Sequence, residues 1–247
     1  MVLRNSGPSP ERAAMVRWTA RIGAVTAEAL AERDSATVAS ARGRLQAAER
    51  AGLLSCSRPL AGRPALYTAT PAGLRATELH SLDPCRVTAS NAGHAIECAT
   101  VAVRLQRAYP DHRVMGEREL RAEESEHGAA LASAVLGMRP DGAPLLHRPD
   151  LVLWPTAAGE SLPLAVEVEL TIKAPRRLRD ICRAWARCRC VEGVLYVAAP
   201  EVLRPLGRAI EKAQASDRIV VLALDAMAGR DQVPANSTLG STVPNDA

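Results

Sequence analysis

Two short apolar stretches decide the fold of this chain, RPDLVLW at residues 148–154 and LAVEVEL at residues 164–170. Apolar runs this short, separated by a few small residues, predict neighbouring strands. Alternation along the second strand places Glu167 and Glu169 on one face and Val168 on the other. Two carboxylates about 7 Å apart on an apolar strand are costly unless a cation compensates them. We therefore interpret the pair as part of a divalent-metal site; the alternative is an exposed edge strand whose carboxylates pair with arginines.

The flanking sequence extends this strand pair into a mixed α/β domain. Along the chain we predict helix 90–108, strand 113–115, a solvated helix in the charged run 117–126, strands 151–154 and 164–170 with a turn at 157–161, helix 176–190, strand 193–198, helix 201–215 and strand 218–224. Apart from the charged run, this order is αβββαβ with one further helix and strand. We assign it to residues 88–226, and assign residues 227–247, rich in Pro, Asn, Ser and Thr, to a disordered tail.

The spacing of Pro149-Asp150, sixteen residues and Glu167-Val168-Glu169 resembles the signature of the PD-(D/E)xK nucleases, which have a restriction-endonuclease-like fold. The resemblance implies that Asp150 and Glu167 bind Mg²⁺, which polarises a scissile phosphate and activates water. Glu169 stands where the signature has lysine, and we expect it to be a third metal ligand or a base. Lys173 is the candidate displaced lysine. It would lie about 13 Å from Glu169 on a straight strand, so the chain must bend to bring it to the site.

Residues 10–80 predict a smaller helical domain that ends in a hairpin. A helix begins at Pro10 after the cap Ser9, a second opens at Thr26, and a third runs from Ser35 to Gly52. In the third helix an inner stripe recurs at helical spacing, and its members are Val38, Ala41, Leu45 and Ala48. The outer side carries small and basic residues, and those we expect to contact DNA are Ser40, Arg42, Arg44, Gln46 and Arg50.

Two short strands, 53–58 and 65–69, follow the third helix and enclose a turn with Arg63 at its tip. Three helices and an arginine-tipped hairpin resemble the winged helix-turn-helix. The resemblance implies binding of duplex DNA, with the third helix in the major groove and the hairpin on the backbone or minor groove. Some domains of this kind serve only in protein contacts.

The helix predicted at 176–190 has an apolar inner stripe and a row of arginines on the opposite face. Arginines without acidic neighbours suit a phosphate backbone, although an exposed helix face rich in arginine is the alternative. The predicted DNA contacts are Arg176, Arg179, Arg183 and Arg187.

In the helix at 90–108, we expect His94 to be a core residue with a local hydrogen bond rather than a metal ligand. The spacing of Cys182, Cys188 and Cys190 fits no zinc site.

Charge is distributed unevenly along the 247 residues, whose net charge is +4. Residues 1–80 have 11 basic and 6 acidic side chains, 81–172 have 8 and 13, and 173–218 have 11 and 5. Two basic segments around an acidic one are what a DNA-facing module with a metal site would give, although solvated helix faces produce similar blocks by chance, so the pattern permits DNA binding without proving it. Phenylalanine is absent and the six other aromatic residues are scattered, which argues against single-strand binding by stacking. The longest apolar run, 219–224, is too short for a membrane helix, and we predict a cytoplasmic protein.

Over residues 15–225 the chain resembles the replication-relaxation family of bacterial mobile elements and chromosomes. The matching pieces are the winged helix, His94, Gly116-Glu117-Arg118-Glu119-Leu120, His147-Arg148-Pro149-Asp150, Glu167-Val168-Glu169-Leu170-Thr171 and the arginine-rich helix. The resemblance implies DNA binding linked to plasmid replication or mobilisation. The leading hypothesis is a two-domain protein that binds double-stranded DNA and nicks or cuts it with Mg²⁺. The rival is a non-catalytic winged-helix regulator with a degenerate nuclease fold. A homodimer is the default for reading palindromic sites.

Overall fold

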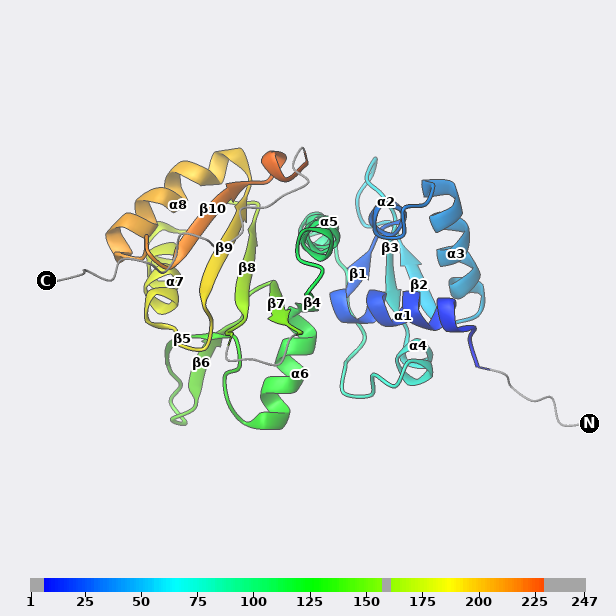
Figure 1. The fold of residues 1–247 in the computed structure, drawn as a ribbon, viewed down its shortest axis with the longest axis horizontal. Helices are drawn as coiled ribbons and strands as arrows, with labels where there is room; N and C mark the ends of the chain where they lie inside the picture. Colours follow the sequence, from blue (N-terminus) through cyan, green and yellow to red (C-terminus); the bar gives the residue numbers. More distant parts are fainter. Residues whose placement is uncertain (1–6, 157–160, 229–247) are drawn as a thin grey trace, which may run out of the picture.

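The computed structural model describes residues 7–156 and 161–228 (Figure 1). They form two parts that lie side by side, N-terminal helices with a small antiparallel sheet and a mixed five-stranded sheet with helices. Helix α5, Ala92–Ala108, lies between the two parts. It contacts the N-terminal helices on one side and the large sheet on the other. The predicted mixed α and β composition is confirmed at this level. Within the described ranges, no helix has the length and apolar character needed to cross a membrane.

The N-terminal part contains a three-stranded sheet in the order β1-β3-β2. Its elements are α1 (Pro10–Ile22), β1 (Ala24–Val25), α2 (Ala27–Arg33), α3 (Val38–Arg50), β2 (Leu54–Ser57), β3 (Leu66–Ala69) and α4 (Pro71–Ala76). Each helix begins after a hydroxyl side chain that accepts a hydrogen bond from the first turn, and these caps are Ser9, Thr26, Thr37 and Thr70. The predicted hairpin forms from β2 and β3, and β1, which we did not predict, pairs with the other edge of β3.

Helix α3 begins at Val38 rather than at Ser35, because the Thr37 hydroxyl caps it by accepting a hydrogen bond from Ser40 N at 3.2 Å. The inner stripe is confirmed for Ala41, Leu45 and Ala48, which are fully buried. Val38 is 37% exposed, so its assignment to the stripe is wrong. It occupies the first turn, at the exposed end of the stripe.

The large sheet has the strand order β10-β9-β8-β7-β4 (Figure 1). Its part of the chain contains β4 (His112–Gly116), α6 (Glu117–His127), β5 (Ala134–Met138), β6 (Pro144–His147), β7 (Leu151–Pro155), β8 (Leu164–Glu169), α7 (Pro175–Arg187), β9 (Gly193–Ala198), α8 (Pro200–Ala213), β10 (Ile219–Ala223) and a 3₁₀ turn at Asp225–Ala228. Strands β4, β7 and β8 are antiparallel neighbours, whereas β8, β9 and β10 run parallel. Strand β8 is the central strand, so the edge-strand alternative for Glu167 and Glu169 is wrong.

Three further expectations need correction. The β5–β6 hairpin was not predicted. Helix α6 is not simply solvated, because Glu119, Leu120 and Glu124 are buried. Met227, which we placed in the tail, is buried at 3% exposure against the sheet. The remainder of the predicted tail, 229–247, and most of the predicted turn at 157–161 lie outside the described residues.

The two faces of the large sheet pack against different helices. One face is covered by α7 and α8, where Trp185 and Leu206 pack on Ala165 and Tyr196. The other face is covered by α5 and includes Val166 and Val168; the sheet and helix residues of this cluster are Val101, Leu105, Leu151, Leu153, Leu195 and Val197. Because side chains alternate along β8, Glu167 and Glu169 lie on the α7–α8 face.

Candidate functional site

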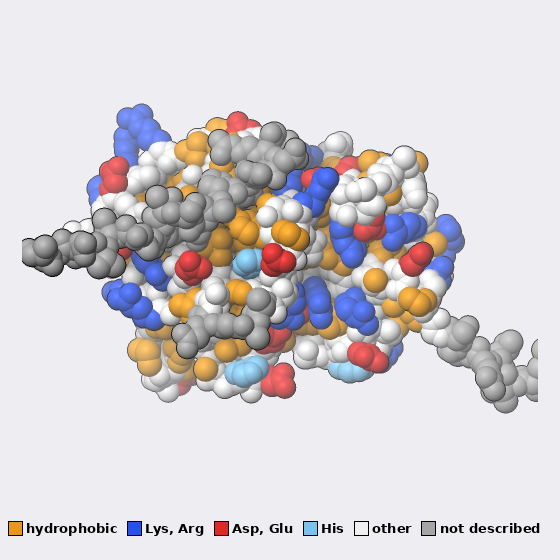
Figure 2. Space-filling view, in the orientation of Figure 1, with side chains coloured by type: hydrophobic (Ala, Val, Ile, Leu, Met, Phe, Trp, Pro, Cys, Tyr) orange, Lys and Arg blue, Asp and Glu red, His pale blue; other side chains and the backbone are white. Residues whose placement is uncertain are grey.

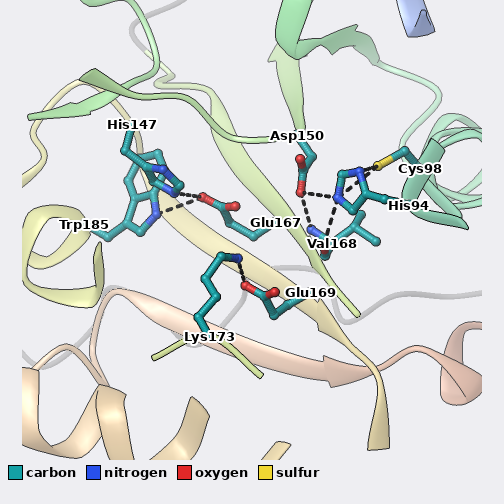
Figure 3. A network of polar contacts seen from close by, with 9 residues as sticks. All are labelled: His94, Cys98, His147, Asp150, Glu167, Val168, Glu169, Lys173 and Trp185. Carbon is teal, nitrogen blue, oxygen red and sulfur yellow. Dashed lines mark hydrogen bonds and ion pairs between the residues drawn. The ribbon is translucent and has the colours of Figure 1, made fainter. Parts of the chain in front are cut away.

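Asp150 lies immediately before β7 and is held by backbone contacts on both sides. Its Oδ2 accepts a hydrogen bond from Val168 N at 2.8 Å, and its carbonyl oxygen accepts one from Glu117 N at 3.0 Å. The first contact fixes the carboxylate against β8, beside Glu167 and Glu169 (Figure 3). The sequence signature therefore brings its acidic residues to one end of adjacent strands, as predicted.

Glu167 is buried like Glu169, and each has 4% of its surface exposed. Its Oε1 accepts hydrogen bonds from His147 Nε2 at 2.7 Å and from Trp185 Nε1 at 3.1 Å (Figure 3). Burial raises the pKa of Glu167, and the His147 contact acts in the opposite direction. The compensating groups are thus an imidazole from β6 and an indole from α7, neither of which we assigned to the site.

Lys173 reaches the site because β8 ends at Glu169 and the chain turns before α7. Its Nζ donates a hydrogen bond to Glu169 Oε2, although Lys173 lies four residues after Glu169 in the sequence (Figure 3). Burial lowers the pKa of Lys173, and the charges of Glu167 and Asp150 oppose that shift. The bend that the displaced-lysine hypothesis required is present in the structure.

His94 approaches Asp150 from the opposite face of the sheet, on α5. Its Nε2 lies 3.1 Å from Val168 O and 3.3 Å from Asp150 Oδ2, and its Nδ1 lies 3.5 Å from Cys98 Sγ (Figure 3). The hydrogen bond to Asp150 is the main cause that raises the pKa of His94, and burial opposes it. The expectation of a core position is wrong, because the His94 side chain is 40% exposed. A local contact, to Cys98 on the same helix, is present, but His94 also contacts Asp150, just before β7, and Val168 on β8.

The fit of Mg²⁺ depends on which side chains can supply oxygen ligands together. Among the described residues, the only group of three ligating side chains with atoms within 4.8 Å of one another is His94, Cys98 and Asp150. The three predicted ligands, Asp150, Glu167 and Glu169, therefore do not form a preformed metal-binding site, and each already contacts another group of the protein. Mg²⁺ usually needs only one or two carboxylates, with waters and substrate phosphate completing the shell.

The outer side of α3 is exposed as predicted for Ser40, Arg42 and Arg50, whereas Gln46 is half-buried. Arg44 is half-buried and pairs with Asp34 at 2.6 Å, so part of its charge is used within the protein. The Arg42 guanidinium lies 3.9 Å from Glu28, a pair in which both side chains are about half exposed. Such surface pairs are weak and can exchange for phosphate.

Arg63 is at the tip of the β2–β3 hairpin but pairs with Glu97 on α5 at 3.0 Å. This contact, which the sequence did not predict, ties the hairpin to α5. About half of the Arg63 side chain is exposed. An interaction with DNA would therefore require the guanidinium to be shared with, or released from, Glu97.

The arginine row on α7 is present, but it does have an acidic neighbour. Asp180 lies 4.0 Å from both Arg176 and Arg183, which corrects the expectation of an unpaired row. Arg187 is exposed, and Arg179 is half-buried with its Nε unpaired among the described atoms. In Figure 2, Lys and Arg side chains are visible at the α7–α8 end and over the N-terminal part, with acidic side chains among them.

A pocket of about 460 Å³ opens between α7 and α8 beside Lys173. Its charged lining is entirely cationic and consists of Lys173, Arg176, Arg179, Arg208 and Lys212. These include both lysines of the whole chain, whose other 29 basic residues are arginines. We refer to these five residues as the cationic pocket. The sequence analysis missed Arg208 and Lys212, because only the packing of α8 against α7 brings them to this face.

Comparison with protein-family models, with curated proteins and with solved structures found no match.

Proposed function

We propose that this protein binds double-stranded DNA and hydrolyses a phosphodiester bond with Mg²⁺ at the site formed by Asp150, Glu167, Glu169 and Lys173. The observation that carries the proposal is the return of Lys173 to Glu169, beside two further carboxylates and the cationic pocket. Acidic ligands, a lysine and an adjoining anion-binding surface are the components that metal-assisted phosphodiester hydrolysis needs.

The arrangement of strands supports a restriction-endonuclease-like core. Helix α5 precedes the antiparallel strands β4, β7 and β8, and α7 then leads to β9, which is parallel to β8. This is an αβββαβ order in which the PD pair enters the second strand and the two glutamates lie on the third. The N-terminal order of three helices followed by the β2–β3 hairpin likewise supports a winged helix-turn-helix.

Each residue of the site has a distinct role in this proposal. Asp150 and Glu167 would hold Mg²⁺, which supplies Lewis-acid activation of the phosphate and of a water molecule. Glu169 would serve as a further ligand or as the base that takes the proton of the attacking water. Lys173 would leave Glu169 for the phosphate and stabilise the charge that develops there. The buried position of Glu167 and Glu169 limits competition by bulk water.

Two surfaces would bind the duplex. The exposed side of α3, with Ser40, Arg42 and Arg50, would enter the major groove. The cationic pocket would bind backbone phosphates next to the acidic site. The resemblance to the replication-relaxation family adds the proposal that the DNA belongs to a bacterial plasmid, mobile element or chromosome. A cytoplasmic homodimer remains part of this proposal.

One observation favours a second function, a non-catalytic DNA-binding regulator. Asp150, Glu167 and Glu169 each already contact a protein donor or cation, so the buried charges do not require a metal for stability. In that case the five-stranded sheet would act as a scaffold for dimerisation or for clamping DNA.

Nicking of supercoiled plasmid with Mg²⁺ or Mn²⁺ distinguishes the two functions. We expect the wild type to nick and Glu169→Gln to lose about 10²-fold or more in rate with near-normal DNA affinity. Lys173→Gln should lose rate to a similar extent and also bind DNA less tightly, because Lys173 belongs to the cationic pocket. Arg75→Gln, an exposed position on α4, is the control for an unrelated charge loss. Wild-type protein that binds duplex DNA but never breaks it with either metal would contradict the nuclease proposal and leave the regulator.

A further inference from the structure

We propose that His94, Cys98 and Asp150 form a second metal site, which binds a transition metal of the Zn²⁺ class with three protein ligands and one open position. The inference goes beyond the nuclease proposal and does not rest on it. Asp150 is shared between the two sites, but His94 and Cys98 lie on the α5 face of the sheet, whereas Glu167 and Glu169 lie on the α7–α8 face.

Two of the three distances between the ligand atoms are close to those of a tetrahedral centre. With bonds of about 2.0–2.3 Å from zinc to nitrogen, oxygen and sulfur, tetrahedral geometry separates ligand atoms by about 3.4–3.6 Å. His94 Nε2 lies 3.3 Å from Asp150 Oδ2 and 3.7 Å from Cys98 Sγ, and all three atoms lie within 4.8 Å of one another. Binding a metal ion therefore requires the His94 ring to turn, so that its Nε2 lone pair points away from Val168 O and towards the other two ligand atoms.

Two backbone elements hold these ligands in place. His94 and Cys98 are four residues apart on α5, so both project from the same side of the helix. Asp150 is fixed by its hydrogen bond from Val168 N and by its own carbonyl contact with Glu117 N. His94 Nε2 now donates to Val168 O, and binding a metal at Nε2 would move that proton to Nδ1 or to water.

A pocket gives access to the group and room for a fourth ligand. It has a volume of about 260 Å³, and its lining includes His94, Cys98 and Asp150 together with Gly23, Asn91 and Arg118. The metal would thus lie where the end of α1 meets α5 and the large sheet. Three protein ligands with an accessible fourth position are typical of zinc sites that bind water or an exogenous ligand.

The ligand types select the metal. A thiolate and an imidazole favour Zn²⁺, Co²⁺ or Fe²⁺, whereas Mg²⁺ requires oxygen ligands. The two sites would therefore take different ions, although both would use the Asp150 carboxylate. Cys188 and Cys190, whose sulfur atoms are 3.2 Å apart near α7, are competing thiols in a titration and need their own control. Cys85, which lines the same pocket as His94 and Cys98, is a further competing thiol, and Cys85→Ser is its control.

The test is a Co²⁺ titration of the chelator-treated full chain, followed by absorption in the thiolate-to-cobalt charge-transfer region and by displacement with Zn²⁺. We expect one equivalent to bind, the charge-transfer band to vanish in Cys98→Ser, and affinity to fall at least tenfold in His94→Gln. Glu167→Gln, Glu169→Gln and Cys190→Ser should retain both the band and the affinity. Circular dichroism of every variant establishes that it is folded.

Several results would overturn this inference. They are the absence of any cobalt–thiolate band in the wild type, a band that persists in Cys98→Ser, and a band that Cys190→Ser removes. Failure of the nuclease proposal looks different, because plasmid nicking would be absent while Co²⁺ still bound to His94 and Cys98. The two proposals are thus tested by different variants and different readouts.

Discussion

His147 Nε2 lies 2.7 Å from Glu167 Oε1, and this contact joins the β5–β6 hairpin to the central strand of the large sheet. His147 is also edge-on to Trp185, with 5.7 Å between ring centroids, and Trp185 donates to the same carboxylate oxygen. The charge of Glu167 is therefore held by two aromatic side chains that come from a hairpin and a helix. This arrangement explains how a carboxylate is accommodated on a central strand.

We expect His147→Ala to lower the free energy of unfolding by about 1–3 kcal/mol, because it removes one of the two donors to a buried carboxylate. Urea denaturation measures the change. His80→Ala is the matched control, since His80 is exposed, and it should change stability by about 0.5 kcal/mol or less. Equal stability of the two variants would show that the hairpin contact contributes nothing to holding Glu167.

Two glycine substitutions should have opposite effects on stability. A Cβ at Gly116 would lie 2.4 Å from Arg21 O, where α1 meets the large sheet, so we expect Gly116→Ala to cost about 1–3 kcal/mol or more. Gly43, in α3, has nothing within 4 Å of the added atom, and Gly43→Ala should stabilise by about 0.5–1 kcal/mol. Thermal unfolding of both variants tests this. A tolerated Gly116→Ala would mean that α1 does not pack closely against this position.

Glu119 gives stability a predictable dependence on pH. Burial raises its pKa, while Arg21 at 3.2 Å and Arg113 at 3.3 Å oppose that shift. When folding raises the pKa of a carboxyl, the resulting stabilisation is fully present at a pH below the pKa of the unfolded state. It is lost as the pH rises through the pKa of the folded state. The stability of the wild type relative to Glu119→Gln should therefore fall as pH rises from about 4.5 towards 7.

Urea denaturation of both proteins across this pH range provides the measurement. Glu126→Gln, an exposed position on the same helix, is the control and should leave the pH dependence unchanged. If the stability of the wild type relative to Glu119→Gln increased with pH, folding would lower the pKa of Glu119 instead of raising it. The charges of Arg21 and Arg113 would then have a larger effect on this pKa than burial.

The cationic pocket should determine part of the salt dependence of DNA binding. Each phosphate contact that is lost lowers the slope of log K against log salt by about 0.9, so Arg208→Gln and Lys212→Gln should each reduce it by up to that amount. Fluorescence anisotropy with a labelled duplex at several salt concentrations measures the slope. Arg75→Gln on α4 should leave the slope unaltered. Slopes that matched the wild type in both pocket variants would place the duplex on another surface.

Local patterns predicted most of the elements correctly. The short runs of Leu and Val became β7 and β8, and Ser9 and Thr26 cap α1 and α2 as predicted, whereas the predicted start of α3 at Ser35 was wrong. The β5–β6 hairpin was missed, because its strands are short, lie next to glycines and are partly exposed, so they lack strong alternation. The prediction of the inner stripe of α3 was wrong only at Val38. Helix periodicity shows which side of a helix a residue is on, but it does not show that the first turn is exposed.

The sequence by itself determined the chemistry available at the site, since the PD pair, the two glutamates and the single nearby lysine are adjacent in two segments. Alternation also determined that Glu167 and Glu169 share a face of β8. Only the tertiary structure decided what surrounds them. It made β8 central, turned the chain so that Lys173 contacts Glu169, and brought His147 and Trp185 to Glu167.

The contact of His94 with Asp150 was likewise decided by tertiary packing. The physical reason is that side-chain periodicity is a local property of the backbone. The partner of a buried charge, in contrast, is chosen by how separate helices and hairpins pack across a sheet.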